Sequence, residues 1–348
     1  MAGKHAGEPK HLCVVLLTGL GDVVNGLPAV NAIRDWAPGL RITWIAEPMP
    51  ASMLEGHPSI DKVVVYHRSD GLGGIRRLRK NLRAEPPIDL TLNMNIYFKS
   101  VWPTLLSRAP RRIGFDRERT FDGVWLAANE HLPAAPRAHT ADMFLEFASY
   151  LGADVSRPEY RIRFTNAELD AREKFYARFA GTPVATIVPA SSSHKKDWVA
   201  ERWAEVADSL SKDFGFSVVL TGGPGDRDNR IAREVERAAG EPVMVALTGS
   251  VRWMASILTR SALVIAPDTG PLHVARALEI PVVGIYGHTN PWRVGPWRAF
   301  SDLWIDHYTE GTPDPAERTP KWEAMPTIAT SEVLEKVEIA VQRYGAGK

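Results

Sequence analysis

The chain has 348 residues, a length that predicts two domains of ordinary size. Its 45% hydrophobic and 24% charged residues are those of a soluble globular protein, and its net charge of +1 excludes a global attraction to nucleic acid or to a membrane. No apolar run is long enough to cross a bilayer, and the single cysteine, Cys13, excludes a disulfide within the chain. We therefore expect a reducing, cytoplasmic location.

The first half of the chain alternates apolar strands with helices. Residues 1–10 carry charge but no apolar run, so they are predicted to be a disordered tail and not a signal peptide. A helix is predicted over Val23–Trp36, where apolar residues recur at helical spacing up to Pro38-Gly39. The strands expected here are His11–Leu17, Arg41–Ala46, Lys62–Tyr66, Asp89–Asn93 and Arg111–Phe115. The further helices expected here are a short one between the second and third strands, Leu72–Arg83, Lys99–Ser107 and His139–Gly152.

A second series of strands and helices begins near Thr182, so the domain boundary is expected near residues 155–181. The strands expected are Val184–Val188, Ser217–Thr221, Val243–Leu247, Leu263–Ala266 and Pro281–Tyr286. The helices expected are Glu201–Phe214, Asp228–Ala239, Val251–Arg260 and Pro271–Leu278. This alternation implies parallel α/β sheets covered by helices on both faces. The Pro- and Trp-rich segment 288–328 is not expected to form regular structure, and a last helix, Ser331–Tyr344, is expected to pack back on the body.

In open parallel sheets, ligands bind outside the carboxyl ends of the strands, and the polar loops of this chain follow strand ends. Gly19-Leu20-Gly21-Asp22 follows the first strand, where two glycines allow a sharp turn and Asp22 begins the next helix. In the second half, hydroxyls, glycines and lysines follow the strands in the segments 190–198, 222–228, 247–249 and 268–273. Such groups, together with a helix N-terminus, suit a diphosphate.

Each of these features also has an ordinary structural explanation. Asp22, Asp268 and Thr269 are residue types that cap helices. Lys195 and Lys196 would then be a solvated pair, and His273 a satisfied buried histidine. Asp226 and Asp228 more readily start a helix than bind a metal, and no His/Cys cluster has metal-ligand spacing. Gly19-Leu20-Gly21 lacks the third glycine of a dinucleotide fingerprint, and no phosphate-binding loop of the Gly-Lys-Ser/Thr type is present.

Together these motifs resemble those of the bacterial heptosyltransferases of glycosyltransferase family 9. The resemblance covers about residues 11–300. It lies in Thr18–Val24 with Leu27-Pro28-Ala29, Lys196-Asp197-Trp198 with Glu201-Arg202-Trp203, Gly222-Gly223-Pro224, and Asp268–His273. It implies the GT-B architecture, two Rossmann-like domains facing each other across a cleft. It also implies inverting, metal-independent transfer of heptose from ADP-heptose to the lipopolysaccharide inner core. The first motif is more similar to that of enzymes adding the first heptose.

The resemblance assigns roles to individual residues. Asp22 stands at the position of the general base, and Lys196 at that of the lysine that holds the donor diphosphate. The donor-binding residues implied are Ser191, Ser192, Lys196, Asp226, Thr248, Gly249, Asp268, Thr269, Gly270, Pro271 and His273. No cofactor is implied beyond ADP-heptose as a substrate. The domains expected are a tail 1–10, an acceptor-binding domain 11–165, a nucleotide-sugar-binding domain 166–330 and the final helix 331–348.

Two basic segments of the first half are candidates for binding an acceptor rich in carboxylates and phosphates, such as Kdo-bearing lipid A. The acceptor-binding residues expected are Gly21, Arg76, Arg77, Lys80, Lys99, Arg111 and Arg112. An ordinary solvated helix is the alternative explanation of the charges. A lipid-linked acceptor implies loose association with the inner face of the cytoplasmic membrane. The protein is further expected to be a monomer without a nucleic-acid partner. Three other functions remain open: a glycosyltransferase that uses another nucleotide sugar or acceptor, a nucleotide-sugar epimerase or hydrolase of the same architecture, and a non-enzymatic nucleotide or sugar binding module.

Overall fold

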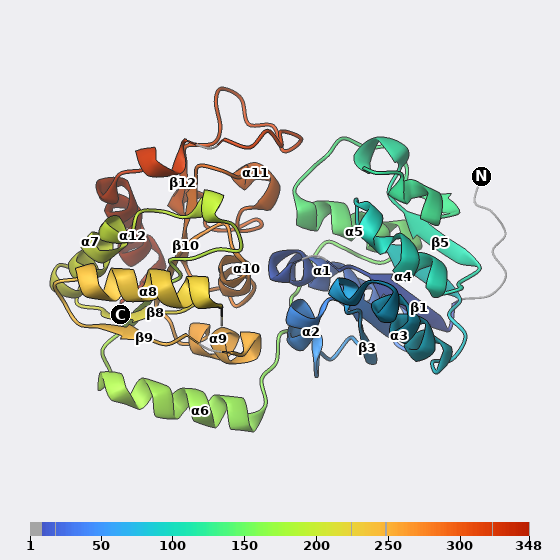
Figure 1. Ribbon diagram of the computed structural model, residues 1–348, viewed down its shortest axis with the longest axis horizontal. Helices are drawn as coiled ribbons and strands as arrows, with labels where there is room; N and C mark the ends of the chain where they lie inside the picture. The colour runs from blue at the N-terminus through green and yellow to red at the C-terminus, as the bar shows by residue number, and fades with distance from the viewer. Residues whose placement is uncertain (1–8, 18, 224, 248, 322, 348) are drawn as a thin grey trace. The chain divides into compact units, whose positions relative to one another are not determined.

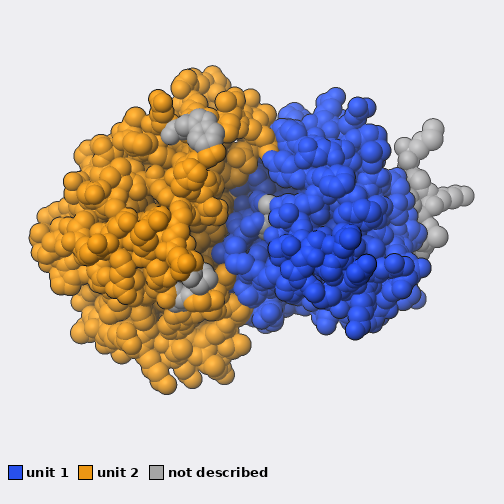
Figure 2. All heavy atoms as spheres, in the orientation of Figure 1, with its two compact units in different colours: residues 1–163 blue, residues 164–348 orange. Residues whose placement is uncertain are grey.

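The computed structural model describes residues 9–17, 19–223, 225–247, 249–321 and 323–347. The chain forms two compact units, which divide between Arg163 and Phe164 (Figures 1 and 2). The described part of each unit contains one six-stranded sheet in which neighbouring strands are parallel. No described helix is long and apolar enough to cross a membrane. The expected tail, residues 1–10, lies almost wholly outside the described residues.

The sheet of the first unit has the strand order β3-β2-β1-β4-β5-β6 (Figure 1). Its strands are β1 (His11–Val15), β2 (Arg41–Ala46), β3 (Lys62–Val65), β4 (Leu90–Asn93), β5 (Arg111–Gly114) and β6 (Glu130–His131). Its α-helices are α1 (Leu20–Trp36), α2 (Pro48–Leu54), α3 (Gly71–Arg83), α4 (Val101–Leu106) and α5 (Thr140–Leu151). Helix α3 packs against α4, and α1 packs against α2 and α5.

Different helices cover the two faces of this sheet, and the side chains of each strand point to these faces in alternation. Cys13 and Val15 of β1 belong to a buried cluster with Leu78 and Leu82 of α3. On the other face, α1 approaches β1 and β2 so closely that a Cβ on Gly26 would lie 2.8 Å from Leu16 Cδ2. The glycine therefore fixes how near the sheet α1 lies, and with it the position of Asp22 one turn earlier.

Asn95 fixes the end of β1, immediately before the glycine loop. Its side-chain amide donates to Val15 O at 2.7 Å, and its Oδ1 accepts from Leu17 N at 3.2 Å. The side chain thus continues the hydrogen bonding of the sheet at the point where the chain leaves it, and it is buried.

We expect Asn95→Ala to lower the free energy of unfolding by about 1–3 kcal/mol, because Leu17 N loses the hydrogen bond it donates to the buried side chain, whereas Val15 O keeps the one it accepts from Met94 N. Asn81→Ala, at an exposed position of α3, is the matched control and should stay within about 0.5 kcal/mol of the parent. Urea unfolding of the three proteins measures the difference, and equal midpoints for the two variants would show that Asn95 is dispensable to this loop.

The sheet of the second unit has the strand order β12-β11-β10-β7-β8-β9. Its strands are β7 (Val184–Ile187), β8 (Ser217–Leu220), β9 (Val243–Val245), β10 (Leu263–Pro267), β11 (Val282–Tyr286) and β12 (Trp304–Asp306). Its α-helices are α6 (Asn166–Tyr176), α7 (Ala200–Lys212), α8 (Asp226–Ala238), α9 (Val251–Leu258), α10 (Gly270–Ala277), α11 (Pro291–Val294) and α12 (Thr330–Tyr344). Helix α12 packs on α7 and on β11 and β12 of the same unit.

Three elements of the second unit differ from the expectation. Helix α6 lies inside the segment expected as a domain boundary, and its signal was the capping box in which Thr165 and Glu168 bond each other's backbone. The expectation that 288–328 lacks regular structure is wrong for β12, which pairs with β11 from Trp304 to Asp306, and for the short helix α11. Three residues are too few for a strand to show its periodicity in sequence.

Candidate active site

An ion pair links two of the polar loops that follow strands in the second unit. Lys196, in the 3-10 turn His194–Lys196 after β7, donates to Asp268 Oδ2 at 2.6 Å and to Asp268 O at 3.2 Å. Asp268 follows β10, the strand that pairs with β7. His273 of α10 places Nε2 3.4 Å from Asp268 Oδ1. The fold thus brings together three residues predicted to bind the donor.

Asp268 is held as a carboxylate although it is 7% exposed. Burial by itself would raise its pKa, but the Lys196 ammonium and the hydrogen bond to His273 outweigh burial and lower the pKa well below its usual range. A buried anion beside a lysine can orient that cation and accept hydrogen bonds from hydroxyl groups. Both properties suit a phosphorylated sugar.

The loop that carries Ser191, Ser192 and Lys196 is fixed by a residue that the sequence analysis missed. Arg227 of α8 bonds both the carbonyl oxygen of Ser191 and the carboxylate of Asp197. Ser191 is buried, and its hydroxyl donates to Ser193 O at 2.8 Å, whereas Ser192 is exposed. The signal available in sequence was an arginine at the start of the helix that follows the next strand, which alone does not indicate a contact with the preceding loop.

The remaining donor residues lie after β8, β9 and β10. Asp226 is exposed at the first position of α8, and Asp228 accepts from Gly223 N at 2.9 Å, which holds the glycine loop. Gly249 is exposed, and the predicted Thr248 lies outside the described residues. Helix α10 begins at Gly270, with Pro271 in its first turn and Thr269 at its N-cap position without a side-chain capping bond.

In the first unit, Asp22 lies in the first turn of α1 and is not the N-cap, because that position belongs to Gly19. Lys99 is close enough to Asp22 and Glu47 for both carboxylates to raise its pKa, although burial is the larger effect and the net pKa is lowered. Glu47 accepts from Arg68 Nε at 2.9 Å. Asp22, Glu47, Arg68 and Lys99 follow β1, β2, β3 and β4, and so form a charged cluster at one edge of the sheet.

The structure separates the basic residues expected to bind the acceptor. Lys99 lies near Asp22, whereas Arg76, Arg77 and Lys80 are exposed on α3. Arg111 and Arg112 of β5 are engaged within the unit. Arg111 forms a two-bond ion pair with Glu130, and Arg112 donates to the carbonyl oxygens of Ala109 and Ala127. Sequence alone missed Glu47 and Arg68, whose only signal is that they follow strand ends.

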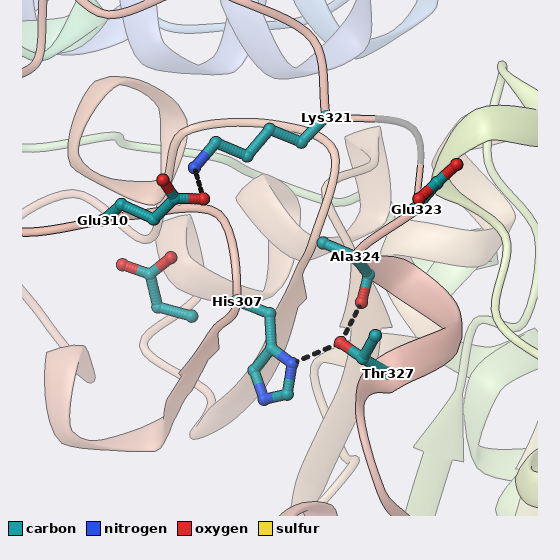
Figure 3. Close-up of a pocket in the computed structure, with 7 residues that line it drawn as sticks. His307, Glu310, Lys321, Glu323, Ala324 and Thr327 are labelled. Atoms are coloured by element: carbon teal, nitrogen blue, oxygen red, sulfur yellow. Dashed lines mark hydrogen bonds and ion pairs between the residues drawn. The ribbon is translucent and has the colours of Figure 1, made fainter.

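A cavity of about 640 Å³ opens near the end of β12 in the second unit (Figure 3). Lys321 in its wall pairs with Glu310, and His307 contacts Thr327 and Glu332. The carboxylates of Asp306 and Glu323 also line it. Lys321 is already paired with Glu310, and Asp306 and Glu323 add negative charge to the wall. The cavity is therefore a poor match for a diphosphate. No cluster of three or more His, Cys, Asp or Glu suited to a metal occurs among the described residues.

The sequence model of the family described as Glycosyltransferase family 9 (heptosyltransferase) matches residues 75–311, more than half of the chain. The chain belongs to glycosyltransferase family 9. It is 29% identical over 296 residues to the lipopolysaccharide core heptosyltransferase OpsX of Haemophilus influenzae, covering 85% of this chain and 84% of that protein. It is 28% identical over 306 residues to lipopolysaccharide heptosyltransferase 1 of Pseudomonas aeruginosa, covering 82% and 80%.

Solved structures of this family share the fold. A family 9 glycosyl transferase from Veillonella parvula superposes with a TM-score of 0.80 at 23% identity, covering 96% of this chain and 97% of that one. The E. coli heptosyltransferase WaaC with ADP superposes with a TM-score of 0.73 at 20% identity, covering 95% and 99%. The α/β architecture with two parallel sheets is therefore that of the GT-B heptosyltransferases, and the enzyme is a glycosyltransferase, as the sequence predicted.

Proposed function

We propose that this enzyme transfers heptose from ADP-heptose to the inner core of lipopolysaccharide, with inversion at the anomeric carbon and without a metal. The observation that carries the proposal is the Lys196–Asp268–His273 cluster on the rim of a family 9 fold. The relatives are named for heptose transfer to lipopolysaccharide, and a solved relative holds ADP.

The second unit is proposed to bind the donor. Lys196 would stabilise the negative charge that develops on the leaving diphosphate, and the start of α10 would add backbone dipoles. Asp268 would accept hydrogen bonds from the sugar. Ser191, Ser192, Asp226, Thr248 and Gly249 follow neighbouring strands and would complete the nucleotide site.

The first unit is proposed to bind the acceptor, with Asp22 as general base. The Asp22 carboxylate would take the proton from the acceptor hydroxyl as that oxygen attacks the anomeric carbon, on the face opposite the leaving diphosphate. One sugar–oxygen bond forms, the bond to the diphosphate breaks, and ADP leaves as an anion. Lys99 lies beside the base and can bind an anionic group of the acceptor.

The test is release of ADP from ADP-heptose with and without Kdo-bearing lipid A, or a heptosylated core as the second acceptor. We expect release to depend on one of these acceptors, to give a product of inverted configuration by NMR, and to persist in EDTA. Binding of ADP-heptose without acceptor-dependent release would overturn heptose transfer to these acceptors. Epimerisation or hydrolysis of the donor would assign a different activity to the same fold.

A further inference from the structure

The first unit exposes a row of large apolar side chains on one short helix. Phe98, Trp102 and Leu105 are spaced at helical intervals through the turn Phe98–Ser100 and α4, and they are 51%, 47% and 42% exposed. The 3-10 turn Val124–Ala127 packs against α4 and carries Leu126, which is 68% exposed. Side chains of this size rarely gather on a surface that faces only water.

Cations border this row. Helix α3, which packs beside α4 (Figure 1), carries Arg76, Arg77, Arg79, Lys80 and Arg83 and no acidic residue. Its buried face is Gly74, Leu78 and Leu82, so Arg76, Arg79 and Arg83 follow one another along the solvent side. Leu72, at the start of the same helix, is 70% exposed.

The segment beside this row is rigidly held. Arg119 is buried and bonds the carboxylates of Asp116 and Glu146 and the carbonyl oxygen of Pro133. These bonds tie the turn before Leu126 to α5. Leu126 therefore follows a segment that the bonds of the buried Arg119 fix within the unit.

We propose that this surface, called here the α3–α4 face, docks the enzyme on an anionic lipid bilayer. Phe98, Trp102, Leu105 and Leu126 enter the boundary between headgroups and acyl chains, and the cations of α3 bind the anionic headgroups. Charge complementarity selects an anionic lipid surface, and the choice of lipid as the occupant rests on the proposed lipid-linked acceptor.

The placement also suits the proposed chemistry. Phe98 and Lys99 are adjacent residues, yet Phe98 is exposed on the face while Lys99 lies near Asp22. A sugar chain that extends from a docked lipid thus has its cationic contact and its base within the same unit as the membrane surface. Docking would hold the enzyme where the acceptor is concentrated.

Co-sedimentation with lipid vesicles tests the inference without donor or acceptor. The vesicles are phosphatidylcholine alone or with about one third phosphatidylglycerol, an anionic lipid. We expect binding to the anionic vesicles only, weakened by salt. The triple variant Phe98→Ser, Trp102→Ser and Leu105→Ser should bind at least about tenfold more weakly, as should Arg79→Gln, Lys80→Gln and Arg83→Gln.

Matched controls come from other exposed positions. Trp36→Ser with Tyr150→Ser removes exposed aromatics from the α1 and α5 side of the same sheet. Arg230→Gln, Arg233→Gln and Arg237→Gln remove three charges from α8. Both controls should bind vesicles as the parent does. ADP binding and thermal unfolding check that each variant is folded.

A second measurement does not depend on loss of binding. Because Cys13 is the single cysteine and is buried, an environment-sensitive dye can be attached at Trp102→Cys or, as a control, at Trp36→Cys. Anionic vesicles should shift the emission of the dye to the blue at position 102 and not at 36. Equal shifts, or equal vesicle binding by the parent and both triple variants, would overturn the inference. So would a serine variant that alters the oligomeric state while binding vesicles normally.

These results separate the inference from the proposed function. Vesicle binding through the α3–α4 face without heptose transfer would leave the docking surface standing and remove the proposed activity. Heptose transfer by an enzyme whose triple variants bind vesicles like the parent would support the proposed activity and remove the docking surface.

Discussion

Asn in place of Asp22 is expected to lower kcat by about 10²–10⁴-fold and to leave the affinity for ADP unchanged. The amide has nearly the shape of the carboxylate but cannot take a proton from the acceptor hydroxyl. Asp22 lies in the first turn of α1 in the first unit, whereas the residues proposed to bind the donor all lie in the second unit. Acceptor-dependent release of ADP measures kcat, and calorimetry measures the ADP affinity.

Asp35→Asn is the matched control, because Asp35 lies near the other end of the same helix and is bonded to Arg161. It should retain the parental kcat. If Asp22→Asn also did so, the base would have to be another group. Glu47 is then the first to test as Glu47→Gln, since it lies near the same lysine.

Apart from the short strands β6 and β12, the positions of the strands could be read from the sequence, because buried parallel strands are continuous apolar runs. Lys196 and Asp268 could be placed on one rim for the same reason: both follow strand ends, and parallel strands present these ends at one edge. Their direct contact, 72 residues apart, could not be predicted, because it depends on β7 and β10 being neighbours in the sheet. Strand order is a property of the whole fold and leaves no local pattern.

The charges of the first half show a different limit. Arg76 and Arg111 look alike in sequence, as members of basic segments. In the structure Arg76 is exposed on α3, whereas Arg111 pairs with Glu130. Charge patterning cannot separate these cases because a partner 19 residues away decides the outcome. Sequence periodicity also misplaces the start of α1. The apolar spacing begins at Val23, whereas the helix begins at Leu20, so Asp22 lies inside the helix and is not its cap.

Lys196→Ala is expected to weaken ADP binding by about 10²-fold, since hydrogen bonds to charged groups contribute about 1.5–3 kcal/mol and each 1.4 kcal/mol is tenfold. Within this cluster, the substitution also leaves the buried Asp268 carboxylate with His273 as its partner. We expect the free energy of unfolding at pH 7 to fall by about 2–4 kcal/mol. Breaking a fully buried pair costs about 3–5 kcal/mol, and the loss here should be smaller because Lys196 is partly exposed. Lys195→Ala, the adjacent lysine, is the control for both measurements.

The pH dependence of this stability has a defined sign. The pKa of Asp268 is lowered in the folded state, so the pair stabilises the fold fully above about pH 4, the ordinary pKa of an aspartate. That contribution is lost as the pH falls through the lowered value. The parent and Lys196→Ala should therefore differ most at neutral pH and converge toward strongly acid pH, as urea unfolding at several pH values would measure. A difference that grew on acidification would contradict the assignment of the pair.

A comparison with Asp268→Asn distinguishes a lysine that binds the diphosphate from one that only supports its partner. ADP lacks the heptose, so a carboxylate that contacts the sugar matters for ADP-heptose and little for ADP. We therefore expect Asp268→Asn to weaken binding of ADP-heptose more than that of ADP, and Lys196→Ala to weaken both. If the two variants and their combination lost the same affinity for ADP, Lys196 would act only by orienting Asp268. A larger loss of ADP affinity in Lys196→Ala than in Asp268→Asn would instead show that the ammonium group itself holds the diphosphate.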